Sequence, residues 1–90
     1  MAYYKKKEKP EPKYFPADYP DFKILKTFRK PRSSRTRIFA TKDPDGWFID
    51  IFNIKTKTGE VASNEGWITE NEIDRWIDWW KNLGWEEQIS

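Results

Sequence analysis

A single segment of this chain carries a full set of helix signals, and it lies near the C-terminus. It begins with a capping box, in which Thr69 starts the helix and Glu72 reaches back to it. It ends at Gly84, a residue type that closes helices in the left-handed conformation and here brings Trp85 toward Trp80. Between these ends runs an apolar stripe at helical spacing, made of Ile73, Trp76, Ile77 and Trp80. The sequence therefore predicts one amphipathic helix over residues 69–83.

The segments before this helix show the alternation of β-strands. Apolar and polar residues alternate in 35–42, and residues 47–54 form a run of strand-forming residues with apolar side chains on both faces. The sequence DPDG between the two is a strong turn signal. Two further strands are expected over 22–28 and 60–62. We therefore predict an α+β fold, in which a four-stranded antiparallel sheet carries one C-terminal helix on one face. The other face would be left to solvent or to a partner.

The amino-terminal part has a different character. Its first 20 residues include four prolines and a lysine cluster, with no apolar periodicity. This composition is typical of a flexible or polyproline-like tail. We expect residues 1–21 to form such a tail and residues 22–90 to form a single domain, because 90 residues support only one small core.

Charge is segregated along the chain although the formal net charge is only +2. Residues 22–42 carry eight basic and no acidic side chains, whereas residues 43–90 carry eleven acidic and four basic ones. A strongly basic segment on two paired strands and their loop is typical of a polyanion-binding surface, which gains affinity by releasing counterions from phosphates. A solvated face and a site for an acidic protein are the alternatives. The candidate contacts are Lys23, Lys26, Arg29, Lys30, Arg32, Arg35, Arg37 and Lys42.

Aromatic side chains make up 18% of the chain, which indicates either a very aromatic core or aromatic side chains displayed at a binding surface. We assign Ile38, Ile49 and Ile51 to the helix-covered face of the sheet. The alternation then places three phenylalanines on the open face beside the positive charge, where they would stack on unpaired bases: Phe39, Phe48 and Phe52. The alternative is that another chain or the amino-terminal tail covers them. Trp79 lies at the edge of the helix stripe and is a candidate dimer contact.

Several kinds of chemistry find no support in the sequence. There is no His and no Cys, so the commonest general base and the commonest metal ligands are missing. Asp50, between Phe48 and Phe52, is expected to form a structural ion pair. We therefore expect no enzyme, no metal and no cofactor. No apolar run approaches a membrane span, and a soluble intracellular protein, cytoplasmic or associated with the nucleoid or nucleus, is the default expectation.

The order of motifs over residues 35–83 resembles the positive cofactor family of transcriptional coactivators. The sequence RIFATKDPDG is similar to the family's first strand and turn, with Lys42 in the place of an arginine. WFIDIF contains its Ile-Asp-Ile motif, and GWITENEIDRW resembles its helix entry. Pro44 replaces the turn aromatic, and Phe52 replaces a basic residue. The resemblance implies a sheet with a packed helix, a homodimer and single-stranded DNA binding, with Arg37 and Lys42 as the best-matched contacts.

Together these patterns predict a homodimeric protein that binds single-stranded nucleic acid with little sequence preference, as an accessory to transcription or replication. The first alternative is a small protein-interaction or inhibitor module. A third reading is a duplex DNA or RNA binder that uses the same basic surface.

Overall fold

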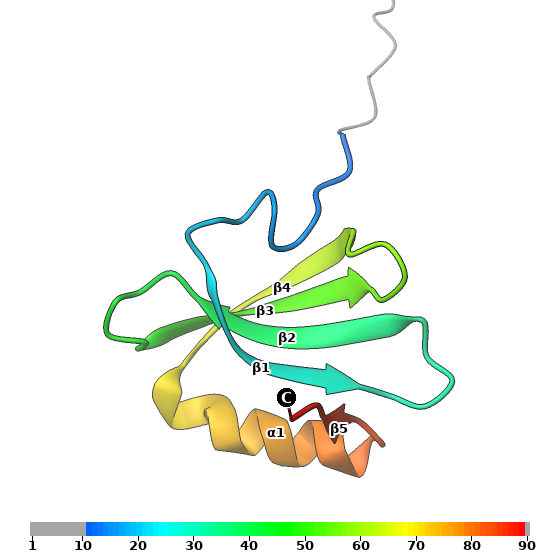
Figure 1. The fold of residues 1–90 in the computed structure, drawn as a ribbon. Helices are drawn as coiled ribbons and strands as arrows, with labels where there is room; N and C mark the ends of the chain where they lie inside the picture. Colours follow the sequence, from blue (N-terminus) through cyan, green and yellow to red (C-terminus); the bar gives the residue numbers. More distant parts are fainter. Residues whose placement is uncertain (1–10, 90) are drawn as a thin grey trace, which may run out of the picture.

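The structure, a computed structural model, describes residues 11–89. It forms an antiparallel sheet followed by one α-helix, which confirms the predicted α+β class (Figure 1). The strands lie side by side in the order β4-β3-β2-β1-β5, so the sheet has five strands rather than four. The elements are β1 (Lys23–Arg29), β2 (Arg35–Thr41), β3 (Phe48–Lys55), β4 (Val61–Thr69), a 3-10 turn (Glu70–Glu72), α1 (Ile73–Asn82) and β5 (Glu86–Glu87).

The ends of the helix are built as the sequence predicts. The carboxylate of Glu72 accepts hydrogen bonds from the backbone N–H of Thr69 at 2.8 Å and from its hydroxyl at 3.0 Å. These bonds lower the pKa of Glu72, chiefly through the backbone N–H of Thr69. At the other end, Trp85 N–H donates to the Trp80 carbonyl and Gly84, at φ +95°, donates to the Lys81 carbonyl. This pair of bonds is the Schellman motif.

The DPDG turn joins β2 and β3 and fixes their register. The Asp43 carboxylate accepts hydrogen bonds from the backbone N–H groups of Asp45, Trp47 and Phe48, and these bonds lower its pKa. In the resulting register Phe39 stands opposite Ile51. Since opposite residues of paired strands share a face of the sheet, Phe39 lies on the same face as Ile51.

This register places Phe39 in the core beneath the helix. Its ring is fully buried and stacks on Trp80, with centroids 4.4 Å apart and an interplanar angle of 11°. The assignment of Phe39 to the open face is therefore wrong. The alternation within each strand is correct, but Phe39 rather than Ile38 joins Ile49 and Ile51 under the helix. The core also contains Phe28, Ile68, Ile77 and Trp85.

The second face of the sheet has its own core, which the amino-terminal segment completes. Phe15 is 7% exposed, and its ring centroid lies 5.0 Å from that of Phe52. Tyr19 and Phe22 pack on the same ring at 5.0 Å and 5.2 Å. Residues 14–22 thus cover part of this face, on the side of the sheet away from the helix (Figure 1). The expectation of a flexible tail over 1–21 is therefore wrong for residues 14–21, which pack on the sheet. The first ten residues of the expected tail lie outside those the structure describes.

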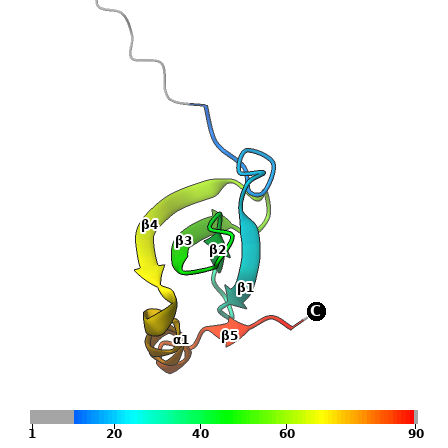
Figure 2. The same ribbon diagram turned by 90° about the vertical axis from the view of Figure 1, so that its left-hand side faces the viewer.

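Two strands differ from the sequence prediction. The expected strand at 60–62 is the start of β4, which continues to Thr69 through register shifts against β3. It curves around one side of the sheet to the start of the helix (Figure 2). β5 was not expected. It pairs with the end of β1, where Phe28 stands opposite Glu87.

Candidate functional site

The eight basic side chains of residues 22–42 do not form one surface. β1 and β2 pair as predicted, but each is seven residues long, and their ends lie about 20 Å apart at about 3.3 Å per residue. Four of the eight gather at the β1–β2 loop, two lie at the opposite end of the hairpin, and two are held by carboxylates. The expectation of a single patch is therefore corrected to a smaller group around the loop: Arg29, Lys30, Arg32 and Arg35.

The β1–β2 loop is fixed from within and from the neighbouring turn. Ser33 N–H donates to the Lys30 carbonyl at 3.0 Å, and the Ser33 hydroxyl accepts a bond from Arg35 N–H at 3.1 Å. Thr56, in the β3–β4 turn, donates its N–H to the Ser34 carbonyl at 2.9 Å. The loop is therefore a defined platform for its cations.

Arg32 at the tip of this loop has φ +66° and is the one non-glycine with positive φ among residues 11–89. Backbone in that region is disfavoured for an arginine, and such strain is often found at functional sites. Arg35 begins β2 after this loop, and its Nη1 atom is buried without a hydrogen-bond partner within the described chain. Part of the hydrogen-bonding capacity of this guanidinium is therefore unused.

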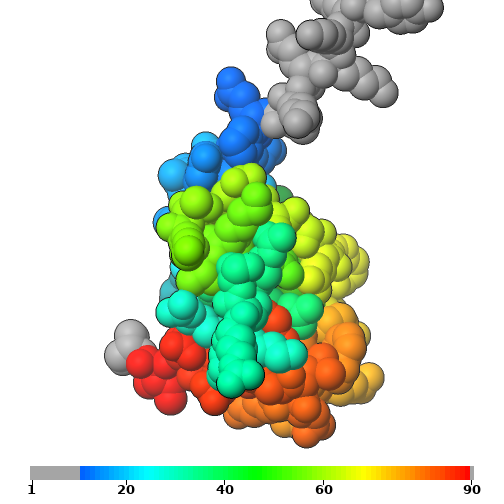
Figure 3. Space-filling model, turned by 90° about the vertical axis from the view of Figure 1, so that its right-hand side faces the viewer, coloured from blue at the N-terminus to red at the C-terminus, as the bar shows by residue number. Residues whose placement is uncertain are grey.

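The cations around this loop are not neutralised by ion pairs to other described residues. No ion pair involves any of the four loop cations within residues 11–89, although Arg29 stands opposite Glu86 in the sheet. The loop projects between the β3–β4 turn and the end of the helix (Figure 3). The side chain of Lys30 passes close to Gly84, because a Cβ on that glycine would lie 3.5 Å from Lys30 Cε. The negative end of the helix dipole thus favours a cation there.

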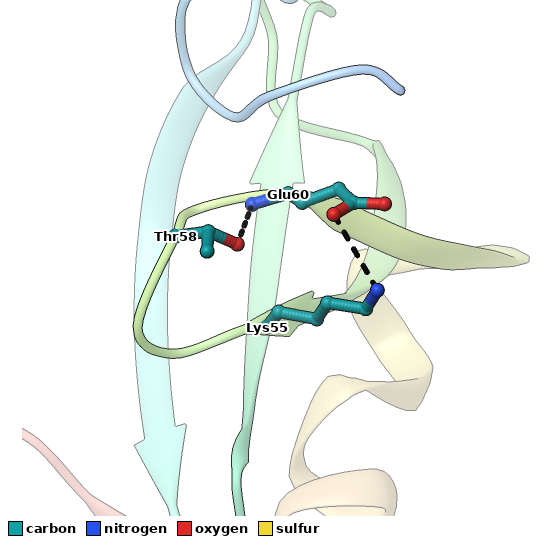
Figure 4. Close-up of polar contacts among 3 residues, drawn as sticks. All are labelled: Lys55, Thr58 and Glu60. Carbon is teal, nitrogen blue, oxygen red and sulfur yellow. Dashed lines mark hydrogen bonds and ion pairs between the residues drawn. The ribbon is translucent and has the colours of Figure 1, made fainter. Parts of the chain in front are cut away.

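The β3–β4 turn adds a further cation that the sequence analysis did not single out. Lys55 is paired with Glu60 at 3.4 Å, and Glu60 N–H donates to the Thr58 hydroxyl at 3.1 Å (Figure 4). Lys57, in the same turn, is exposed and forms no ion pair within the described residues. The hairpin predicted around DPDG already brings the start of the strand at 35–42 beside the end of the strand at 47–54. In the structure Arg35 pairs with Lys55, which lies two residues before Lys57. We call the group Arg29, Lys30, Arg32, Arg35 and Lys57 the basic end.

Two predicted contacts serve the fold instead. Lys26 lies 3.3 Å from a carboxylate oxygen of Glu87, which ties β1 to β5. Arg37 lies 3.7 Å from Glu65, and its guanidinium stacks over the rings of Trp80 and Trp85 at 5.2 Å and 4.6 Å. Cation–π contacts of this kind stabilise the packing of the C-terminal segment. Arg37 is therefore not available as a surface contact, although the family resemblance suggested it.

Lys23 and Lys42 lie at the far end of the hairpin. They share a shallow surface hollow with three acidic side chains: Asp21, Asp43 and Asp45. Lys42 Nζ also lies 5.7 Å from the centre of the Phe22 ring. The mixture of charges makes this end a poor site for a polyanion, so these two lysines do not extend the basic end.

Of the three phenylalanines predicted to form an aromatic platform on the open face, one, Phe48, is exposed there. Phe39 and Phe52 are both fully buried, on opposite faces of the sheet, so neither can stack on a base. Phe48 is 49% exposed and pairs edge-to-face with Trp67, which is 63% exposed. Trp67 lies in the part of β4 beyond the strand expected at 60–62, so the sequence prediction does not place it on the sheet. Trp79 is 51% exposed, as a surface contact requires.

Asp50 does not form the predicted ion pair with any residue of the described part of the chain. It stands opposite Ala40 on one side and Trp67 on the other. No group of three or more carboxylates within residues 11–89 is arranged to hold a metal ion. In the same stretch, no helix has the length and apolar character needed to cross a membrane.

Comparisons of the chain with protein-family models, with curated proteins and with solved structures find no match. The resemblance of residues 35–83 to the positive cofactor family therefore stays a prediction, and a function has to be proposed from the residues of this chain alone.

Proposed function

We propose that this protein binds single-stranded nucleic acid through the basic end, with its cations on the phosphates. The observation that carries the proposal is the gathering of five cations on and beside two hydrogen-bonded turns, without ion pairs to other described residues. Phosphate contacts position a strand without reading its bases, so little sequence preference is expected. A flexible single strand can follow the projecting loop on either side.

The test is a fluorescence anisotropy titration of a labelled thymidine oligonucleotide at two salt concentrations. The variant Lys30→Gln/Arg32→Gln removes two cations from the basic end. Each lost phosphate contact lowers the salt slope of a single strand by about 0.7, so we expect a decrease of about 1.4 together with weaker binding. Arg32→Gly is a companion variant, because glycine removes the charge and accepts the φ of +66° without strain.

The matched control is Lys23→Gln/Lys42→Gln, which removes the same charge from the far end of the hairpin. We expect it to bind almost as well as the parent. An equal loss in both double variants would mean that only net charge matters, which contradicts a localised site. Failure of the parent protein to bind at low salt would reject the proposal altogether.

Duplex binding is the second candidate, and a specific feature favours it. β1 and β2 form a two-stranded ribbon with a basic tip, and the major groove of DNA admits such a ribbon. A duplex of the same length, titrated in parallel, separates the two. Tighter binding of the duplex at matched salt would replace the single-strand proposal by this one.

We propose a homodimer as the state in which the protein acts, with Trp79 in the contact. Trp79 and Leu83 lie one helical turn apart and are both about half exposed, and Trp76 packs beside Trp79 with ring centroids 5.1 Å apart. This exposed apolar surface of the helix also fits the alternative of a protein-interaction module. Light scattering is expected to give twice the chain mass for the parent and the monomer mass for Trp79→Ala. A monomeric parent would reject the dimer and would favour binding of another protein to this exposed apolar surface.

A further inference from the structure

The amino-terminal segment covers only part of the second face of the sheet, and beyond it two aromatic rings stay exposed. Phe48 is 49% exposed and Trp67 is 63% exposed. Their ring planes stand at 84° to each other with centroids 5.1 Å apart, and they line a hollow of about 380 Å³. The rest of the lining consists of Lys42, Asp43 and Asp50. Because the face of an aromatic ring is electronegative, exposed rings of this kind attract cations.

The register of the sheet places a carboxylate beside these rings. Asp50 stands opposite Trp67 in β4 and opposite Ala40 in β2, so the three side chains share one face. Ala40 is small and fully buried, which leaves space beside the carboxylate. Asp50 is half-buried, and its side chain has no hydrogen bond or ion pair to another described residue. Its oxygens can therefore accept hydrogen bonds from a ligand that enters the hollow.

The charges in and around the hollow also favour a cation. Asp43 supplies a second carboxylate, which three backbone N–H groups hold in its ionised form. Lys42 is the single base in the lining, and its ammonium lies 5.7 Å from the centre of the Phe22 ring. Along the chain, residues 58–74, which include β4, carry five acidic and no basic side chains. Such surroundings repel a phosphate and attract a basic segment.

The same combination of groups occurs a second time in the molecule, and there it holds an arginine. The Arg37 guanidinium lies over two aromatic rings, Trp80 at 5.2 Å and Trp85 at 4.6 Å, and 3.7 Å from a carboxylate oxygen of Glu65. The hollow likewise offers two aromatic rings and a carboxylate, but no arginine of residues 11–89 lines it. The occupied arrangement indicates which ligand fits the open one.

The hollow lies beside a sheet edge that can accept another strand. β4 is the edge strand in the sheet order and forms the outer side in Figure 2. The amino-terminal segment meets it only at its beginning, where Tyr14 stands opposite Glu60, and up to Thr69 the rest of this edge pairs with no other described strand. A strand added there would place a side chain beside Trp67 on the same face, two strand spacings or about 10 Å from Asp50. The side chains of an arginine and of Asp50 together span that gap.

We propose that the hollow of Phe48, Trp67 and Asp50 binds an arginine of another protein, carried on an extended basic segment that pairs with the outer edge of β4. A guanidinium is planar, so it stacks on an aromatic face while its N–H groups donate to the carboxylate. Backbone pairing supplies further hydrogen bonds, as in other complexes where a peptide adds a strand to a sheet edge. The site shares no residue with the basic end, so it is independent of nucleic-acid binding there.

The test is a titration of the full chain with the acetylated and amidated peptide Ser-Val-Thr-Arg-Thr-Val-Ser. Binding is followed by calorimetry and by the Trp67 indole N–H resonance in ¹⁵N spectra, which Trp67→Leu identifies. We expect this peptide to shift the resonance, its lysine version to bind more weakly, and its glutamine version to have little effect. No binding, or equal binding of the arginine and glutamine peptides, would overturn the proposal. Tighter binding of the lysine peptide would overturn the assignment to a guanidinium.

Substitutions then separate the components of the contact. Asp50→Asn keeps the shape of the side chain but removes its charge, and we expect the arginine peptide to bind at least about tenfold more weakly. Trp67→Leu removes the ring face and should weaken binding by about two- to fivefold. The matched control is Asp78→Asn, which makes the same charge change at an exposed position of α1 and should bind like the parent. Equal losses in the two aspartate variants would mean that only net charge matters, which contradicts a localised site.

N-methylated peptides test the pairing with β4. Adjacent backbone N–H groups of a strand point to opposite sides, so only one of two neighbouring amides can face the sheet edge. One peptide is methylated at the amide of its arginine, and the other at the amide of the following threonine. We expect one of the two to lose binding and the other to keep it. Equal behaviour of both would exclude strand addition.

The protein alone shows whether another part of this chain fills the hollow. We expect the Trp67 resonance to be the same in the parent and in Arg32→Gly at every protein concentration. A concentration-dependent shift that only the parent shows would assign the hollow to the β1–β2 loop of a second copy. Peptide binding that appears only in Lys5→Gln/Lys6→Gln/Lys7→Gln would assign it to the chain's own lysines. Either result would overturn the proposal.

Discussion

Phe39→Ala tests whether this side chain belongs to the core or to a binding surface. The ring is fully buried between Phe28, at 5.9 Å, and Trp80, at 4.4 Å. Truncating such a phenylalanine costs about 3–5 kcal/mol, of which an aromatic contact contributes about 0.5–1.5 kcal/mol. Since a small domain is stable by only about 5–15 kcal/mol, much of the native stability would be lost.

The assay is urea unfolding followed by circular dichroism, with Phe39→Leu and Phe48→Ala as companions. Leucine keeps most of the buried volume, so its cost is expected to be about 1.5 kcal/mol. Phe48 is 49% exposed, and its truncation should cost about 1 kcal/mol or less. A loss below about 1 kcal/mol for Phe39→Ala, or one equal to that of Phe48→Ala, would refute the placement of Phe39 beneath the helix.

Three further predictions follow from the packing and the helix ends. Phe15→Ala uncovers the Phe52 ring and should cost about 3 kcal/mol and increase the binding of an apolar dye; unchanged stability would show that residues 14–22 do not hold the second core. The pKa of Glu72 is lowered on folding from its ordinary value of 4.5, so its contribution to stability is complete above that pH and is lost as the pH falls through the folded pKa. The stability difference between the parent and Glu72→Gln should therefore be larger at neutral pH than in acid, and a difference independent of pH would contradict the hydrogen bonds to Thr69. Gly84→Ala should destabilise the protein by about 1 kcal/mol, because a Cβ there has space but φ is +95°; a neutral effect would argue against the Schellman end.

The features that could be predicted from the sequence are those decided by neighbouring residues. The capping box at Thr69, the end at Gly84 and the DPDG turn each depend on a few adjacent side chains, and each has the expected hydrogen bonds. The strand alternation was likewise correct. Local patterns of this kind determine where an element begins and ends and which side chains share its face.

The features that were missed depend on how distant segments meet. The sequence defined two faces on β2 and two on β3, but only the register shows that Phe39 joins Ile51. Phe15 and Phe22 lie in a proline-rich stretch without periodicity, so nothing local marks them as the cover of Phe52. The basic residues were identified correctly by type, but their division among the loop, the far end and two ion pairs depends on strand length and on Glu65 and Glu87.

The pairing of β5 with β1 has a mechanical consequence. The two strands run antiparallel, and Gln88 N–H bonds the Thr27 carbonyl just beyond the last paired residues. A force that pulls the amino-terminal side of β1 and the carboxyl-terminal side of β5 apart acts along the direction of the hydrogen bonds, which lie across antiparallel strands. The bonds therefore break one at a time rather than together. Stretched from its ends, the chain should release β5 at low force and then peel Trp85 away from Arg37, while β2 and β3 remain paired.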